Sequence, residues 1–194
     1  CQRLQSLPIE DSKIQEVLND IPTTDRNSFK EDYVNIKQKV SVIIPARYKS
    51  TRFPGKPLVD INGIPMIVRV SNIVGEAVGK ENVYIATENS KIANVVRDNG
   101  YKVILTSDSC LTGTDRVAEA SMEVDGDIIV NVQGDEPLLN PKHIQMVIDE
   151  KIKYPNHIIN CMARVESYED VTDTKLPKMV VNEENELMYS SRSA

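Results

Sequence analysis

Short apolar runs alternate with helical patterns along most of the chain. Four such runs, rich in β-branched residues, begin at Val40, and they occupy 40–46, 82–87, 101–106 and 127–133. Continuous apolar runs of this length are typical of strands buried on both faces of a parallel sheet. We expect two later strands as well, at 157–163 and 178–182.

Each of the four runs is followed by a stretch with helical periodicity. The helices are expected to start with Pro65 as first residue, with Ser90 as N-cap, with Thr114 as N-cap, and with Asn140 as N-cap before Pro141. The second should end before Gly100 and the fourth near Tyr154. Alternating strands and helices with right-handed crossovers predict an α/β fold with a doubly wound, mostly parallel sheet. Its ligand site should lie at the carboxyl ends of the strands.

The first 39 residues have a different, polar texture. Ile14, Val17, Leu18 and Ile21 fall on one helical face before a break at Pro22. We therefore expect an N-terminal helical extension or linker over 1–39 and one α/β domain over 40–194.

Composition narrows the class of protein. Of 194 residues, 40% are hydrophobic and 27% charged, the formal charge is −6, and no apolar run reaches the roughly 18 residues that would span a bilayer. The acidic balance argues against nucleic-acid binding, which needs a basic surface. Three cysteines without a CxxC pair favour a reducing cytoplasm over a disulfide framework or a cysteine zinc site. Because the chain starts at Cys1 without a signal-peptide pattern, we expect it to be a piece of a longer protein.

Against that acidic background, the segment after the first strand gathers cations. Arg47, Lys49, Arg52 and Lys56, with the hydroxyl of Ser50, lie within ten residues. Arginine and lysine bind phosphate oxygens as a fork and as a point charge respectively. A solvated basic loop is the alternative. The Walker and Rossmann glycine patterns are both absent, which weakens ATPase and dehydrogenase interpretations.

Two further segments follow predicted strands. Gln133, Gly134, Asp135 and Glu136 follow the fourth, and we expect Asp135 to bind Mg²⁺, which takes one or two carboxylates plus phosphates and water. An exposed turn is the alternative there. In the segment 112–116, Arg116 could face a ligand, but a helix start explains these residues equally well.

Three motifs in this order resemble the 3-deoxy-manno-octulosonate (Kdo) cytidylyltransferase family, the CMP-Kdo synthetases. They are IIPARYKSTRFPGKPL after Val42, TGTDRVAE at 112–119 and VNVQGDEP at 130–137, and the spacing of 178–192 fits the family segment that ends in FSR. The resemblance covers residues 40–194 and implies a nucleotidyltransferase (Rossmann-like) domain that is incomplete at its C-terminus.

The resemblance also implies a reaction: CMP passes from CTP to the anomeric hydroxyl of the 2-keto-3-deoxy sugar acid Kdo, with Mg²⁺, for lipopolysaccharide or capsule synthesis. It implies a cytoplasmic enzyme that is a homodimer when complete. It assigns CTP to Arg47, Ser50, Arg52, Lys56, Thr112, Gly113 and Arg116, the sugar acid to Gln133 and Arg192, and Mg²⁺ to Asp135, with Arg47, Lys56 and Asp135 catalytic.

The chain departs from the family pattern at four places. Cys110 replaces a His, Thr112 a Ser and Ser190 a Phe, and the sequence stops at Ala194 before a second acidic metal ligand. Another acidic sugar, 8-amino-Kdo or a sialic acid, therefore stays open as substrate. A catalytically incomplete nucleotide-binding or interaction domain is the alternative outside the enzyme class.

Overall fold

The computed structural model describes residues 38–49, 53–165, 167 and 171–193. Contacts divide the chain between Lys39 and Val40. The helix expected around Ile14 to Ile21 lies outside the described residues, so the nature of 1–39 stays a prediction. Across the described ranges, no helix combines the length and the apolarity needed to cross a membrane.

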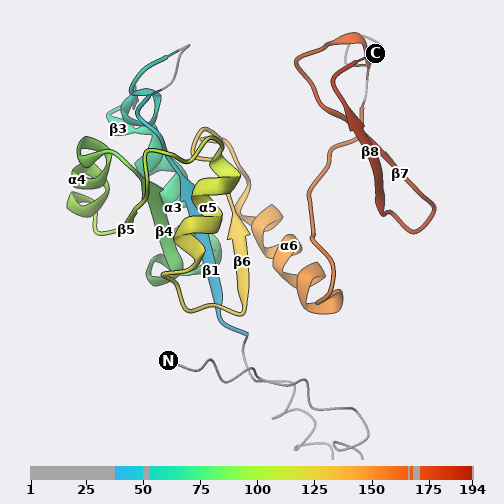
Figure 1. Cartoon of the computed structure of the whole chain (residues 1–194), viewed down its shortest axis with the longest axis horizontal. Helices are drawn as coiled ribbons and strands as arrows, with labels where there is room; N and C mark the ends of the chain where they lie inside the picture. Colours follow the sequence, from blue (N-terminus) through green and yellow to red (C-terminus); the bar gives the residue numbers. More distant parts are fainter. Residues whose placement is uncertain (1–37, 50–52, 166, 168–170, 194) are drawn as a thin grey trace, which may run out of the picture. The chain divides into compact units, whose positions relative to one another are not determined.

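The centre of the fold is a sheet of four parallel strands in the order β5-β4-β1-β6 (Figure 1). The strands are β1 (Val40–Pro45), β4 (Val83–Thr87), β5 (Lys102–Leu105) and β6 (Ile128–Asn131). Val42 stands opposite Val83 on one side and Val130 on the other. All four predicted strands are therefore confirmed, each within a few residues of its expected bounds.

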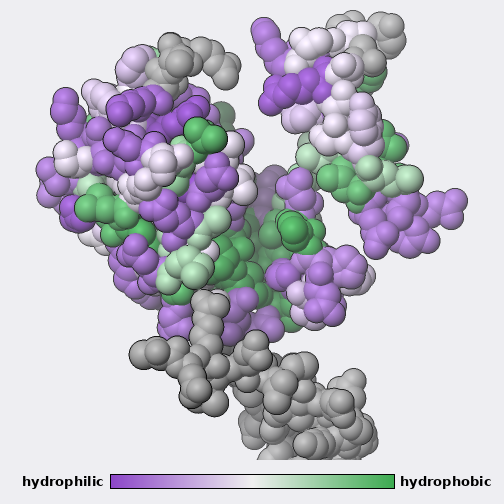
Figure 2. Space-filling view, viewed as in Figure 1, coloured by the Kyte–Doolittle hydropathy of each residue, from purple (hydrophilic) through white to green (hydrophobic). Residues whose placement is uncertain are grey.

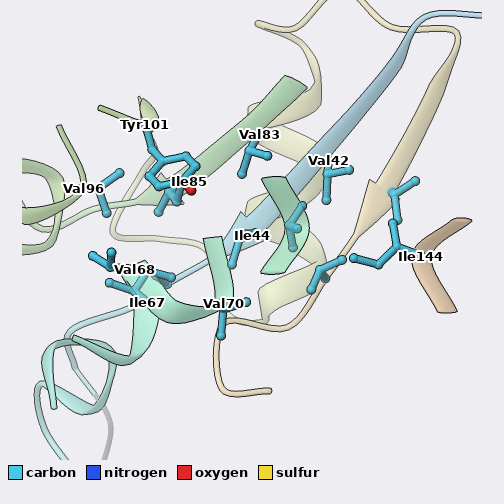
Figure 3. Close-up of a cluster of buried hydrophobic side chains, with 14 of the residues drawn as sticks. Val42, Ile44, Ile67, Val68, Val70, Val83, Ile85, Val96, Tyr101 and Ile144 are labelled. Atoms are coloured by element: carbon cyan, nitrogen blue, oxygen red, sulfur yellow. The ribbon is translucent and has the colours of Figure 1, made fainter. Parts of the chain in front are cut away.

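Helices cover both faces of this sheet. They are α3 (Met66–Val78), α4 (Ser90–Asp98), α5 (Gly113–Ser121) and α6 (Pro141–Lys153). Side chains of α3, α4 and α6 join one buried cluster with alternate strand residues such as Val42 and Ile85 (Figure 3). On the other face, Val117 of α5 packs in a second cluster with Ile43 and Ile104. The predicted doubly wound α/β arrangement is confirmed.

The strand order reverses beside β1. From β1 the chain proceeds to β4 and β5 on one side, and then crosses by α5 to β6 on the other side. The loops after β1 and β6 therefore leave neighbouring strands at the point where the strand order reverses, and open α/β sheets bind ligands at the carboxyl edge of such a point. The cationic segment and the Asp135 segment are those two loops.

Three helix starts differ by one or two residues from expectation. Pro65 ends β3 (Ile64–Pro65) and precedes α3, whose first residue is Met66. The side chain of Asn89, not Ser90, caps α4 by accepting from the Lys91 amide at 2.9 Å. Helix α5 is capped two residues earlier than Thr114, at Thr112. The first backbone amides of a helix have no acceptor within the helix, and a capping side chain must reach one of them to accept its hydrogen bond. Neighbouring polar residues can each supply such a side chain, so the sequence alone leaves the cap position uncertain by one or two residues.

The C-terminal elements differ more. β7 (Lys178–Val181) confirms the last expected strand, but it pairs antiparallel with β8 (Leu187–Ser191), which the sequence pattern did not predict. The strand expected at 157–163 is wrong, because these residues form no ladder and Ile158 is 98% exposed. A short hairpin of β2 (Asp60–Ile61) and β3 was also missed.

On the visible face, green apolar patches interrupt a mainly hydrophilic surface (Figure 2).

Candidate functional site

A cavity of about 580 Å³ lies at the carboxyl edge of the sheet. Three segments line most of it. Among the described residues, the β1 end and loop contribute Pro45, Ala46, Arg47, Phe53, Lys56 and Pro57. The start of α5 contributes Leu111, Thr112, Gly113 and Arg116, and the β6 loop contributes Gln133, Gly134 and Asp135. Met66 of α3 also lines the cavity.

The cationic loop and the acidic loop meet inside this cavity. Lys56 Nζ lies 2.6 Å from Asp135 Oδ2, and both side chains are about half exposed, at 43% and 49%. Gly134 makes the approach sterically feasible, since a Cβ there would come within 2.9 Å of the Pro45 carbonyl oxygen. A cation and a carboxylate therefore face the same space from neighbouring strands.

A backbone hydrogen bond closes the loop after β1 and positions the two cations that this loop contributes to the described cavity lining. The Gly55 amide donates to the Tyr48 carbonyl at 2.9 Å, and Gly55 has a φ of +74°, which a residue without Cβ adopts readily. Arg47 immediately precedes this closure and Lys56 immediately follows it. The loop thus brings both cations to one side of the cavity although they are nine residues apart in sequence.

The start of α5 is held by a capping box. The Thr112 hydroxyl accepts from the Asp115 amide at 3.1 Å, and the Asp115 carboxylate accepts from the Thr112 amide at 2.9 Å. A hydrogen bond from the Thr112 side chain to the Asp115 carboxylate, followed by the one from the Thr112 amide, lowers the pKa of Asp115. Gly113, the first helical residue, lines the cavity beside Pro45 and Gln133.

A buried ion pair lies behind the cavity. Arg116 Nη2 and Glu88 Oε2 are 3.0 Å apart, and their side chains are only 4% and 7% exposed. Among the described residues no donor makes a hydrogen bond to that Glu88 oxygen, so the contact is one of charge. The other Glu88 oxygen accepts from the Tyr48 amide at 2.8 Å, and Arg116 Nη1 donates to the Thr106 hydroxyl. Sequence reasoning missed Glu88, although its place directly after a buried strand was a usable signal.

Cys110, which stands where the resembling family has His, is tied to α5. Its thiol donates to Glu119 Oε2 at 3.0 Å. That hydrogen bond is the main cause of a raised pKa for the Cys110 thiol, with desolvation next. The hydrogen bond to Glu119 thus disfavours the thiolate form of Cys110.

The structure brings together most of the predicted site residues. Those lining the cavity are Arg47, Lys56, Thr112, Gly113, Arg116, Gln133 and Asp135. Ser50 and Arg52 lie outside the described residues. Arg192 is not among the lining residues; its guanidinium donates to the Lys175 carbonyl at 2.6 Å. Within the described part of the chain, no three His, Cys, Asp or Glu side chains cluster as a metal site, so Asp135 supplies a single carboxylate.

A parallel sheet between two helical layers, with cations and a carboxylate facing each other where the strand order reverses, defines an α/β domain of nucleotidyltransferase type. Residues 41–194 match the family model described as cytidylyltransferase. The chain belongs to the cytidylyltransferase family.

Individual relatives agree with this assignment. The chain is 41% identical over 156 residues to a 3-deoxy-manno-octulosonate cytidylyltransferase of Geobacter metallireducens, covering 80% of this chain and 61% of that protein. It is 41% identical over 162 residues to an 8-amino-3,8-dideoxy-manno-octulosonate cytidylyltransferase of Shewanella baltica, covering 79% and 65%. A solved CMP:2-keto-3-deoxy-manno-octonic acid synthetase in complex with CTP matches with a TM-score of 0.72 and 34% identity, covering 80% of this chain and 64% of that one. The chain thus spans somewhat less than two thirds of the length of these relatives.

Proposed function

We propose that this chain carries the nucleotide-binding part of an enzyme that transfers CMP from CTP to the anomeric hydroxyl of Kdo, releasing pyrophosphate. The observation that carries the proposal is the cavity in which Lys56 and Asp135 meet beside Arg47 at the reversal of strand order. The names of the Geobacter relative and of the solved synthetase support the choice of CTP and Kdo.

Arg47 and Lys56 are the proposed ligands of the CTP phosphates. Both line the cavity, and both flank the closed Tyr48–Gly55 segment, so they face one ligand from two backbone positions. A guanidinium and an ammonium group lower the energy of charge that builds up on phosphate oxygens. Ser50 and Arg52 belong to the same proposal through the family motif alone.

The cytidine is proposed to lie against Thr112 and Gly113 at the start of α5. Gly113 leaves room there, and the capping box with Asp115 fixes the position of Thr112 on the cavity wall. Arg116 forms part of the wall, but its guanidinium is engaged by Glu88 and Thr106. Gln133, in the β6 loop, and Arg192 stay proposed ligands of the sugar acid.

A divalent cation fits beside Asp135. The carboxylate is a hard oxygen ligand, lies about half exposed on the cavity wall, and is neutralised by a single lysine that can move to a phosphate. One protein carboxylate suffices for Mg²⁺ when phosphate oxygens and water complete its coordination. When bound, Mg²⁺ would neutralise phosphate charge in the transition state.

The residues of this chain would then work by positioning and charge. The sugar hydroxyl attacks the α-phosphorus in line and loses its proton to solvent, the bond from the α-phosphorus to the bridging oxygen breaks, and pyrophosphate leaves. Arg47 and Lys56 hold the departing oxygens, while Gln133 and Asp135 of the β6 loop also line the cavity.

Relatives named for 8-amino-3,8-dideoxy-manno-octulosonate make the amino sugar the second candidate acceptor. The family resemblance further suggests a cytoplasmic enzyme and a homodimer for the complete protein. Size-exclusion chromatography with light scattering tests the latter.

The experiment has two stages. Calorimetric titration of the chain with CTP, UTP, GTP and ATP should show preferential binding of CTP, and equal affinity for all four would overturn the proposal. Pyrophosphate release is then measured with CTP, Mg²⁺ and either Kdo, 8-amino-Kdo or a sialic acid. Release with Kdo supports the first candidate and release only with another acid supports its alternative. CTP binding without release identifies a catalytically incomplete nucleotide-binding domain.

A further inference from the structure

The buried ion pair of Glu88 and Arg116 connects parts of the molecule that lie apart in sequence. Glu88 directly follows β4, and Arg116 belongs to the first turn of α5. Through Thr106, which follows β5, Arg116 also reaches the end of a third strand. Neither charged side chain is available to solvent, since both are more than nine-tenths buried.

Glu88 acts on the cavity through one backbone amide. Its Oε1 accepts from the Tyr48 amide at 2.8 Å, and the Tyr48 carbonyl accepts from the Gly55 amide at 2.9 Å. The backbone of Tyr48 is therefore held at its amide by Glu88 and at its carbonyl by Gly55. Because Arg47 precedes Tyr48 and Lys56 follows Gly55, a shift of Tyr48 displaces both cavity cations together.

Arg116 acts on Glu88. A buried carboxylate without a counter-charge is strongly disfavoured, and the Arg116 guanidinium 3.0 Å away supplies that counter-charge. An ionised acceptor forms a shorter and stronger hydrogen bond to an amide than a neutral acceptor does. The pair also joins α5 to the β1 loop, and both segments line the cavity.

We propose that the Glu88–Arg116 pair is a positioning device that holds Arg47 and Lys56 at the separation required by the β- and γ-phosphates of CTP. This inference rests on the proposed function. It assigns Glu88 and Arg116 an indirect role, acting through Tyr48, in place of a contact with the nucleotide.

The main variant is Glu88→Gln, which keeps an oxygen for the Tyr48 amide but removes the charge. A second variant, Glu88→Leu with Arg116→Met, replaces both charges by apolar side chains, because a lone buried guanidinium can prevent folding. Glu123→Gln is the matched control, since it makes the same chemical change at an exposed position just after α5.

Two readouts separate positioning from a merely structural role. The first is the pair of dissociation constants for CTP and CMP, because CMP lacks the β- and γ-phosphates. We expect the CTP constant to rise roughly tenfold in both variants, the effect of weakening a charge-assisted contact, while the CMP constant of Glu88→Gln stays within about twofold. The second is hydrogen exchange at the Tyr48 amide without nucleotide, which should become faster while β1 and β4 amides keep their protection.

An equal loss of CTP and CMP affinity would overturn the inference, as would parental CTP affinity or parental Tyr48 exchange in a folded variant. Failure of the proposed function gives a different result, namely a parent chain that does not prefer CTP. The exchange measurement still tests the contact between Glu88 and Tyr48 in that case.

Discussion

Replacement of Gly134 by alanine tests whether the close approach of the β1 and β6 loops builds the cavity. The new Cβ would lie 2.9 Å from the Pro45 carbonyl oxygen, and it would also come within 3.3 Å of Ile67 Cδ1 and 3.4 Å of Ile44 Cγ2. The nearest of these atoms is backbone, in a residue that is paired with Ala86 of β4, so it cannot rotate away as a flexible side chain would. Gly134 is not among the glycines with positive φ, so the cost is steric.

The magnitude follows from two opposing effects. Overpacking a tight site costs about 1–3 kcal/mol, and replacing glycine by alanine regains about 0.4–1 kcal/mol by restricting the unfolded chain. We therefore expect Gly134→Ala to lose about 1–2 kcal/mol of unfolding free energy, which lowers the Tm by roughly 2–8 °C. Asp135 should shift with its neighbour, and CTP affinity should fall as the contact with Lys56 opens.

Gly113→Ala is the matched control, because Gly113 also lies beside Pro45 in the cavity lining. Its Cβ would meet Pro45 Cγ at 3.5 Å and Gln133 Oε1 at 3.7 Å, both ordinary contact distances. This variant should unfold with at least the parental free energy. Urea denaturation followed by circular dichroism measures both variants. Equal stability of the two, or of Gly134→Ala and the parent, would refute the steric reasoning.

Three further predictions concern charge. Arg47→Ala or Lys56→Ala should each weaken CTP binding by at most about 3 kcal/mol, because other cations remain nearby; calorimetric titrations matching the parent for both would contradict the phosphate assignment. The pKa of Asp115 is lowered in the folded chain, so its stabilisation is present above its ordinary value of 3.8 and is lost as pH falls through the folded pKa. Urea unfolding across acid pH should therefore show a shallower loss for Asp115→Asn than for the parent, and identical slopes would count against the capping box. A hydrogen bond to Glu119 raises the pKa of Cys110, so Glu119→Gln should speed the alkylation of the Cys110 thiol by iodoacetamide at neutral pH. Mass spectrometry measures the alkylation rate, and an unchanged rate would exclude this hydrogen bond as the cause.

The central sheet was predictable because its strands are buried on both faces. A strand such as β4 must be apolar along nearly its whole length, and this leaves a continuous run in the sequence. The cations and Asp135 were predictable for a related reason, since the carboxyl ends of parallel strands share one edge. The residues around Ile158 also form a short apolar run, but in the structure they are mostly exposed and pair with no strand, so the strand predicted at 157–163 was wrong.

Contacts between distant segments were beyond the sequence pattern. Glu88 and Arg116 look like ordinary charged residues next to a strand and within a helix, and only the fold shows that both are buried and face each other. The N-cap of α5 also depends on a contact that only the folded structure shows, here between residues close in sequence. Thr112 and Thr114 have identical side chains, and the capping box with Asp115 selects Thr112.

Lys56 and Asp135 serve as each other's counter-ion at 2.6 Å. An anion that draws Lys56 to itself leaves Asp135 uncompensated, and a cation that binds Asp135 leaves Lys56 uncompensated. The two binding events are therefore thermodynamically linked: whichever comes first favours the other. By reciprocity, the factor by which a triphosphate tightens the hold on a divalent cation must equal the factor by which that cation tightens the hold on the triphosphate.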